Sequence, residues 1–318
     1  MQRILMFAAK RLLAMVVVLW VIVTIVFFLA HASPYDPIKL IVGQRANESP
    51  LAVLRMRHFY GLDKPVWQQY VTYVGGLIHG NLGYSEESSS FGRPVWSILE
   101  QGVPVSLKLG GLAILLALIV GLPIGLLSAL KQNSFLDHGL QGVIITLYAV
   151  PAFVLVPISQ VVFGAQLQWL PVAGWGDSGV QGLKEMVLPV TLYAAGLAGY
   201  FALSFRSFML EVLQQDYIRT ARAKGLRTRV VIYVHALKNT LLPLASIVGP
   251  TVAFLIVGAF IIEFFFSIPG IGFITITSIT QSDYPVIEAT TIVLAAFVVF
   301  INMLTDILYA IIDPRVRL

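Results

Sequence analysis

The sequence contains no cysteine and very little charge. Only 12% of its 318 residues are charged, against roughly 25% in an average soluble protein, and 58% are hydrophobic. The lack of cysteine excludes disulfides, thiolate metal sites and cysteine nucleophiles. The lack of charge excludes a single soluble core and indicates an integral membrane protein. The net charge of +5 does not indicate a nucleic-acid partner, because Lys and Arg in a membrane protein mainly mark its cytoplasmic loops.

Motifs for nucleotide, metal and nucleophile chemistry are also scarce. The chain has no G-x-x-x-x-G-K-[ST] and no H-E-x-x-H, and its five histidines are scattered without ligand spacing. Ser128-x-x-Lys131 formally matches a serine–lysine nucleophile pattern. We interpret Lys131 as a lysine that snorkels from a helix end. We therefore expect no catalytic residue, no metal site and no bound cofactor in this chain.

Six apolar runs are long enough to cross a bilayer, which takes about 20 helical residues. They cover residues 12–29, 105–130, 140–162, 186–208, 244–266 and 286–312. The first run follows Arg3, Lys10 and Arg11, and it is longer than the core of about 7–15 residues in a signal peptide. We therefore expect an uncleaved anchor. The predicted fold class is an all-α integral membrane protein with six transmembrane helices.

Most of the 21 lysines and arginines fall in the two tails, near Lys131 and between Arg206 and Lys238. This asymmetry predicts that both termini are cytoplasmic. We expect three parts. Residues 1–30 form the N-terminal tail and first span, residues 31–103 an extracytoplasmic segment, and residues 104–318 a five-span core with a cytoplasmic loop at 209–243. Within the external segment, residues 51–60 and 67–80 have helical spacing of apolar side chains, and Gly61 would end the first of these helices.

Small and ionisable residues within the spans have structural interpretations. Gly121-x-x-x-Gly125 is a small-residue face that predicts close helix packing. Glu263 and Asp306 are the clearest ionisable residues inside the spans. An ion-coupled carrier would pair such groups near the midplane at broken helices, and no such pair is visible. We expect Glu263 to serve local capping or pairing rather than substrate contact.

The loop at residues 211–243 is the most informative stretch. It contains six cations, Arg219, Arg222, Lys224, Arg227, Arg229 and Lys238, beside the small residues Ala221, Ala223 and Gly225. Gly225 is a natural helix end, because glycine adopts left-handed dihedral angles without steric cost. Thr228 would then cap a second helix, and Pro243 would end or kink it.

Residues 216–243 resemble the coupling-loop motif of inner-membrane permeases of bacterial ABC importers, in the branch that handles dipeptides, oligopeptides and nickel. Further stretches in the same order resemble other parts of those permeases. They are residues 60–83, 93–95, 263–272 and 313–315. Together these stretches extend from the external segment to the C-terminus.

The resemblance implies the type I importer permease fold and a set of partners. These are a second homologous permease subunit, two cytoplasmic ATPases that bind ATP and Mg²⁺, and an extracytoplasmic substrate-binding protein. The coupling helix would dock in an ATPase groove. It would comprise Arg219, Thr220, Ala221, Arg222, Ala223, Lys224, Gly225 and Leu226.

Individual roles at this helix are implied in the same way. Arg219-Thr220-Ala221 stands where importers generally have Glu-Ala-Ala, a departure that is usual in the peptide branch. Charge and residue size add a hypothesis, in which Arg219, Arg222 and Lys224 pair with acidic groups on the rim of the ATPase groove and Ala221 and Gly225 permit close approach. On the outside, the binding protein would contact a face that includes Trp67, Tyr70, Pro269, Gly270 and Gly272.

The implied substrate is a short peptide, and the implied cellular location is the bacterial inner membrane. Relatives in this branch also move nickel chelates, glutathione or oligosaccharides, and these remain alternatives. An ion-coupled secondary carrier would need midplane charges and internal repeats. A membrane-embedded enzyme would need a nucleophile with a base, for which Ser128 and Lys131 are the only formal candidates.

Overall fold

The computed structural model describes residues 2–32, 50–59, 62–86, 90, 92–176, 179–255 and 259–312. These residues are mainly helical, and within them the only β pairing is an isolated bridge between Tyr84 and Pro94. The chain divides into two compact units. Unit 1 comprises Met1–Pro104 with Pro269–Leu318, and unit 2 comprises Val105–Ile268.

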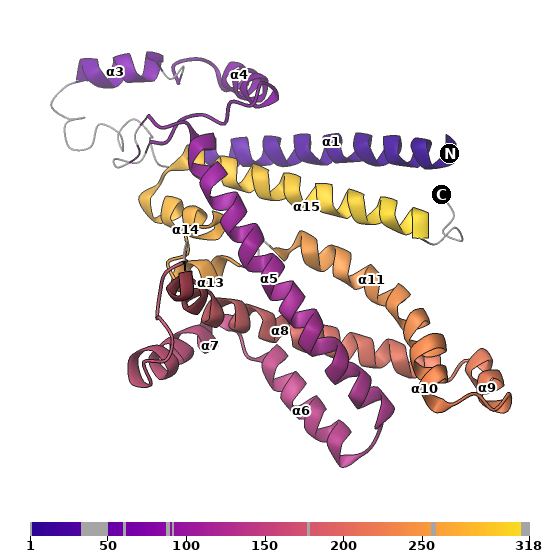
Figure 1. Cartoon of the computed structure of the whole chain (residues 1–318). Helices are drawn as coiled ribbons and strands as arrows, with labels where there is room; N and C mark the ends of the chain where they lie inside the picture. The colour runs from indigo at the N-terminus through magenta and orange to yellow at the C-terminus, as the bar shows by residue number, and fades with distance from the viewer. Residues whose placement is uncertain are drawn as a thin grey trace. The chain divides into compact units, whose positions relative to one another are not determined.

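Unit 1 is built on two long helices that lie side by side, α1 (Gln2–His31) and α15 (Tyr284–Ile312) (Figure 1). An ion pair of 3.0 Å between Arg11 and Asp306 joins them. The helices predicted at residues 51–60 and 67–80 are confirmed as α3 (Pro50–Phe59) and α4 (Val66–Ile78), and α14 (Ile271–Gln281) completes the unit. The predicted helix stop at Gly61 and the C-terminal stretch 313–315 lie outside the described residues.

An aromatic cluster fixes α4 against α1. Phe27 of α1 is 3% exposed, and its ring meets that of Tyr70 edge-on with 5.3 Å between centroids. The hydroxyls of Tyr70 and Thr24 lie 2.7 Å apart and share a hydrogen bond. Edge-to-face aromatic pairs of this kind add about 0.5–1.5 kcal/mol beyond area burial. The surface helix α4 is therefore attached to the first span by specific side chains.

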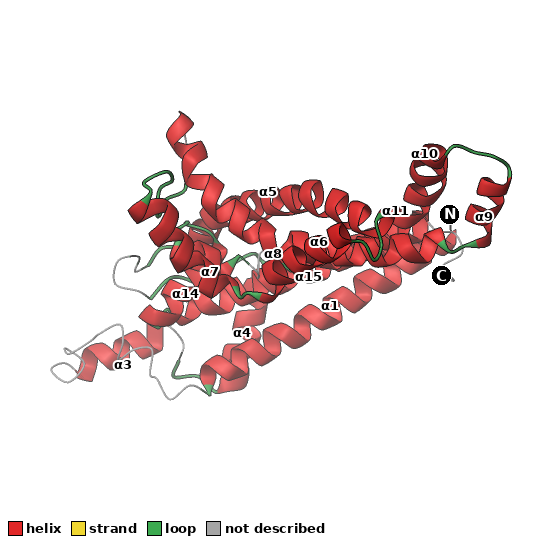
Figure 2. Ribbon diagram, turned by 90° about the horizontal axis from the view of Figure 1, so that it is seen from below, coloured by secondary structure: helices red, strands yellow, loops and turns green. Residues whose placement is uncertain are grey.

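Unit 2 contains the remaining helices, and the views in Figure 1 and Figure 2 show them from two directions. The helix α5 (Val95–Leu130) enters from unit 1. After it come α6 (Phe135–Ala149), α7 (Ala152–Ser159), η2 (Gln160–Gln166), α8 (Gly179–Leu213), α9 (Asp216–Ala223), α10 (Thr228–Val230), η3 (Val231–Ala236), α11 (Leu237–Ala253) and α13 (Phe260–Phe265).

The predicted small-residue face is confirmed, and its partner is α8. A Cβ placed on Gly121 would lie 2.7 Å from the carbonyl oxygen of Ala198. A Cβ on Gly125 would lie 2.6 Å from the carbonyl oxygen of Ala202. Both distances are too short for any side chain, so the two backbones touch because these positions are glycine. We call this contact the α5–α8 seam.

Within the described residues, five helices are long and apolar enough to cross a membrane. The predicted number of six is reached when the pair α6 and α7–η2, which is bent by 95°, is counted as one span. The predicted bounds of the fifth span, residues 244–266, are wrong. The helix runs from Thr228 to Ala253, and α13 is a separate element. Arg229, His235 and Lys238 lie in the first half of this helix. Because these polar residues interrupt the apolar run, the sequence pattern placed the start of the span too late.

Candidate functional site

The helix α9 ends in a Schellman motif, as the glycine predicted. Gly225 has φ of +77°, and its N–H donates to the carbonyl of Arg222 at 2.9 Å. The N–H of Leu226 donates to the carbonyl of Ala221 at 3.4 Å. These two bonds satisfy carbonyls that the helix end would leave open. The capping role expected for Thr228 is wrong, because Thr228 is the first residue of α10 and its N-cap, Arg227, makes no side-chain cap bond.

The inner face of α9 is packed into its own chain. Ile218 is fully buried and Ala221 is 6% exposed, and three residues apart they share one helix face. They form an apolar cluster, here called the α9 anchor, with residues of α5, α8 and η3. The other members of the anchor are Ala129, Met209, Val231 and Ala236. The expectation that Ala221 contacts an ATPase is therefore corrected, since its side chain permits close approach to this chain's own helices.

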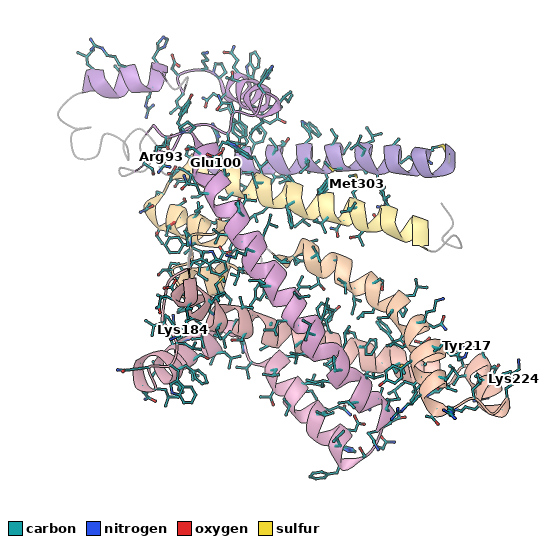
Figure 3. The ribbon with its side chains drawn as sticks, in the orientation of Figure 1. Arg93, Glu100, Lys184, Tyr217, Lys224 and Met303 are labelled. Atoms are coloured by element: carbon teal, nitrogen blue, oxygen red, sulfur yellow. The ribbon has the colours of Figure 1, made fainter. Side chains whose placement is uncertain are left out.

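The outer face of α9 is polar and cationic. Arg219, Thr220, Arg222, Ala223, Lys224 and Gly225 are all exposed, and Leu226 adds an apolar side chain that is 40% exposed. Arg219 also lies 3.4 Å from Asp216 across the surface, a kind of pair that contributes about 0–1 kcal/mol. Figure 3 shows Tyr217 and Lys224 at the end of unit 2 opposite Lys184. Seven of the eight predicted coupling residues thus form one exposed surface.

A buried ion pair near the same helix ends escaped the sequence analysis. Asp137, in the first turn of α6, is fully buried. Its carboxylate accepts from Arg206 Nη2 at 2.8 Å, Arg206 Nε at 3.1 Å, Gln141 at 2.9 Å and the backbone N–H of Asn133 at 2.9 Å. The Ser128 hydroxyl also donates to it. We call this network the Asp137 clasp, and it joins α5, α6 and α8.

The Asp137 clasp explains why a serine stands at position 128. The Ser128 hydroxyl donates to Asp137 and accepts from Arg206 Nε at 3.0 Å, so the formal pattern with Lys131 reflects packing and not nucleophile chemistry. A buried carboxylate needs this many donors, because an unpaired buried charge is costly. The sequence does show an acidic residue, Asp137, and a basic residue, Arg206, near the ends of different spans. Because they are 69 residues apart, nothing in the sequence indicates that they pair.

Ionisable groups at the other end of unit 2 have local partners. The Ser106 hydroxyl donates to Glu263 Oε1 at 2.6 Å, and both residues are fully buried. Lys108 Nζ lies 5.5 Å from the centre of the Trp175 ring, within range of a cation–π contact. The local pairing expected for Glu263 is confirmed.

The predicted binding-protein face is only partly on the surface of unit 1. Trp67 is 64% exposed and Pro269 is exposed, whereas Tyr70 is half-buried against α1. Gly270 and Gly272 are buried. A Cβ on Gly102 would lie 3.2 Å from the carbonyl carbon of Gly270, so this segment packs against α5. Of the five residues predicted for this face, Trp67 and Pro269 are therefore the exposed ones.

Comparison with known proteins gives the same ordered match. The family described as "Binding-protein-dependent transport system inner membrane component" matches residues 121–318. The family of its N-terminal region matches residues 4–109. The chain belongs to this family. The resemblance to importer permeases is thereby confirmed, and this binding-protein-dependent permease is a multi-pass inner-membrane protein.

Relatives of the permease match over nearly its whole length. The dipeptide transport system permease protein DppB of Lactococcus lactis subsp. cremoris is 39% identical over 310 residues, covering 97% of this chain and 98% of that protein. The oligopeptide transport system permease protein OppB of Salmonella typhimurium is 37% identical over 311 residues, covering 98% of this chain and 99% of that protein.

Solved structures agree on the fold. A chain of the inward-facing MetNI methionine ABC transporter aligns with a TM-score of 0.59 at 16% identity, covering 70% of this chain and 99% of that chain. A chain of an amino acid ABC transporter aligns with a TM-score of 0.51 at 14% identity, covering 69% and 94%. Identities this low show the fold alone, which is that of the type I importer permeases.

Proposed function

We propose that this chain and a second related permease together form the transmembrane pathway of an ATP-driven importer of short peptides. Two cytoplasmic ATPases hydrolyse ATP, and an extracytoplasmic binding protein delivers the substrate. The peptide substrate is supported by the names of the relatives, which are dipeptide and oligopeptide permeases matched over nearly their whole length. This chain supplies no catalytic group.

The observation that carries the proposal is the two-sided character of α9. Its outer face presents cations and Leu226, which suits a groove with an acidic rim and an apolar floor. Its inner face, through Ile218 and Ala221, packs against the ends of α5 and α8. Movement imposed on the outer face therefore passes to the spans as rigid-body motion, which is how alternating access opens a pathway to each side in turn.

This arrangement requires α9 to lie in the cytoplasm, with both chain termini on the same side. The excess of Lys and Arg around α9 supports that orientation. On the opposite side, Trp67 and Pro269 of unit 1 offer exposed apolar surface to the binding protein. Large apolar surface that remains exposed on a folded unit commonly marks a contact site.

The test is transport by the reconstituted complex. The chain, its paired permease and the two ATPases are placed in proteoliposomes with the binding protein, and uptake of labelled tri-alanine is measured with ATP. Uptake with ATP, and none with a non-hydrolysable analogue, is the expected result. Uptake driven by a sodium or proton gradient without ATP would overturn the proposal.

Parallel uptake assays separate the substrate classes. Labelled nickel chelate, glutathione and a maltooligosaccharide are offered to the same proteoliposomes. Tri-alanine should be taken up at least as fast as any of them. ATP-dependent uptake of one of these without uptake of peptides would replace the substrate while leaving the importer mechanism in place.

A further inference from the structure

Unit 2 contains a cavity of about 610 Å³ beside the bend between α6 and α7. Residues of α6, α7, α8 and α11 line it, and Figure 1 shows α6 and α7 diverging at this point. The volume lies within the range of about 300–1,000 Å³ that is typical of small-molecule sites. We call it the Pro151 cavity.

The bend leaves backbone carbonyls of cavity-lining residues without a helical partner. Pro151 has no N–H to donate to the carbonyl of Leu147. The N–H of Val150 donates to Thr146 at 3.2 Å, and the hydrogen bonds of α7 begin with Val154 to Pro151 at 2.9 Å. Within the described residues, no hydrogen bond reaches the carbonyls of Leu147, Tyr148 and Val150, and all three residues line the cavity.

Open carbonyls at membrane depth need an explanation. Each unsatisfied backbone group in hydrocarbon costs several kcal/mol, so such groups are tolerated only in protein or beside water-filled space. Secondary transporters use broken helices near the midplane to bind their cargo. The carbonyls of Leu147 and Tyr148 need hydrogen-bond donors, which water or the N–H groups of a peptide in the cavity would supply.

Polar side chains in the cavity are neutral. The rings of Tyr148 and Tyr200 stack with 6.3 Å between centroids, and the Tyr193 hydroxyl is held by the carbonyl of Leu255 at 2.5 Å. Ser246 and Thr251 add hydroxyls, and none of the described lining residues is charged. A lining of neutral donors and acceptors among apolar walls carries no fixed charge that would repel side chains of one sign.

A second pocket of unit 2 has a lining of a different kind from that of the Pro151 cavity. It measures about 330 Å³ and lies between α5 and the first half of α8. Its lining is aliphatic except for Thr191, whose hydroxyl donates to the carbonyl of Val187 at 2.7 Å. This aliphatic groove suits an acyl chain. The open carbonyls and tyrosines distinguish the Pro151 cavity from a surface made only for lipid.

We propose that the Pro151 cavity binds the backbone of the transported peptide during its passage. The carbonyls of Leu147 and Tyr148 accept from peptide N–H groups, and the hydroxyls of Tyr148 and Tyr200 donate to peptide carbonyls. The site recognises the backbone N–H and C=O groups that all peptides have, so it binds the peptide without selecting its sequence. This inference rests on the proposed function, since it takes a short peptide as the cargo.

Gly196 permits a direct test. It lines the cavity, and a Cβ placed on it meets nothing within 4 Å. Gly196→Leu therefore adds a bulky side chain at the cavity wall, and its Cβ contacts nothing in this chain. Gly142→Leu is the matched control, because a Cβ on Gly142 also meets nothing within 4 Å and this residue does not line the cavity.

The assay uses the reconstituted complex and a tri-alanine analogue that carries a photo-reactive diazirine. During ATP-driven uptake, labelling should map to the cavity, with Tyr148 and Tyr200 among the sites. Gly196→Leu should remove this labelling and lower uptake by roughly tenfold or more, since a filled site excludes its ligand. Gly142→Leu should keep both, and both variants should assemble with the ATPases.

Other outcomes decide against the inference in distinguishable ways. Wild-type uptake with labelling only outside the cavity, or unchanged uptake by Gly196→Leu, would overturn the cavity assignment and leave the importer intact. Labelling of the cavity by a photo-reactive fatty acid and never by the peptide would make it a lipid site. Absence of any ATP-dependent peptide uptake by the wild-type complex would instead overturn the proposed function.

Discussion

Unit 2 joins its helices in two opposite ways. At the α5–α8 seam, Gly121 and Gly125 let two backbones touch, so the pair has no space in which to shift. At the bend between α6 and α7, Pro151 interrupts a span and leaves a cavity of about 610 Å³. Packed interiors move as blocks and not as fluids. The seam is therefore suited to transmit movement, and the bend is suited to provide space for cargo.

The α9 anchor includes residues of α5 and α8, the two helices of the seam, and none of α6 or α7, the two helices of the bend. Its members Ala129 and Met209 lie near the ends of α5 and α8. We therefore expect work received at α9 to move these two helices together. The Asp137 clasp adds α6 to the same block, because it ties the first turn of α6 to Arg206 of α8.

The largest effect is expected at the clasp. Arg206→Met leaves the buried Asp137 carboxylate without its cation, a change that costs about 3–5 kcal/mol. The melting temperature of the purified complex should fall steeply. Arg229→Met, which removes an exposed arginine, is the control and should change little.

A double variant sharpens this prediction. Replacing both partners, with Arg206→Met and Asp137→Leu, removes the charge pair as a whole and should recover most of the lost stability. Equal melting temperatures for Arg206→Met and the wild type would show that the clasp does not hold α6 to α8.

The seam is expected to give a smaller loss. Gly121→Ala places a methyl group 2.7 Å from a carbonyl oxygen, and such overpacking costs about 1–3 kcal/mol. Gly111→Ala adds the same methyl group to the same helix, where it meets nothing within 4 Å. Thermal unfolding should separate the two variants. An identical melting temperature for both variants would show that the α5–α8 seam does not require glycine at position 121.

At α9 the expected cost is local. A residue other than glycine at the positive φ of Gly225 costs about 1–2 kcal/mol, and a β-branched side chain is especially unsuited. Gly225→Val should therefore distort the outer surface, lowering peptide uptake while ATP hydrolysis and membrane insertion persist. Gly225→Asn, which tolerates left-handed dihedral angles, should transport more than Gly225→Val. Full transport by Gly225→Val would argue against docking at this loop.

The smallest effect depends on pH and lies in unit 1, outside the spans. Burial and the negative charges of Asp283 and Glu288 raise the pKa of Glu86 from 4.5 to about 7. Between these values the folded chain holds the proton more tightly than the unfolded chain, so stability falls as the pH rises through this window. Glu86→Gln should therefore melt above the wild type at about pH 8 and equally at about pH 4.

The control for this pH effect is Glu100→Gln, which changes an exposed glutamate of the same unit (Figure 3). It should show no difference that depends on pH. A stabilisation of Glu86→Gln that is the same at both pH values would contradict the shifted pKa as its cause.

Local signals in the sequence predicted much of this fold. Apolar runs located the spans, Gly225 located the end of α9, and Gly121 with Gly125 predicted close packing. Each of these signals lies within one segment. The start of the fifth span was missed because Arg229, His235 and Lys238 interrupt the apolar pattern while the helix continues through them.

Features that depend on pairing between segments could not be read in this way. The clasp joins Asp137 to an arginine on another helix, and nothing near Asp137 in the sequence marks its partner. The burial of Ala221 depends on where α5 and η3 lie. The bend of 95° at Pro151 and the cavity depend on how α8 and α11 pack beside it.

The most direct test of the central claim, that α9 transmits the work of ATP hydrolysis through its buried face, is the number of peptides imported per ATP in proteoliposomes. Ile218→Ala loosens the α9 anchor, and Tyr217→Phe changes an exposed side chain of the same helix that is not among the predicted coupling residues. We predict a lower ratio for Ile218→Ala and the wild-type ratio for Tyr217→Phe, with ATPase subunits bound in both. An unchanged ratio for Ile218→Ala would contradict the account.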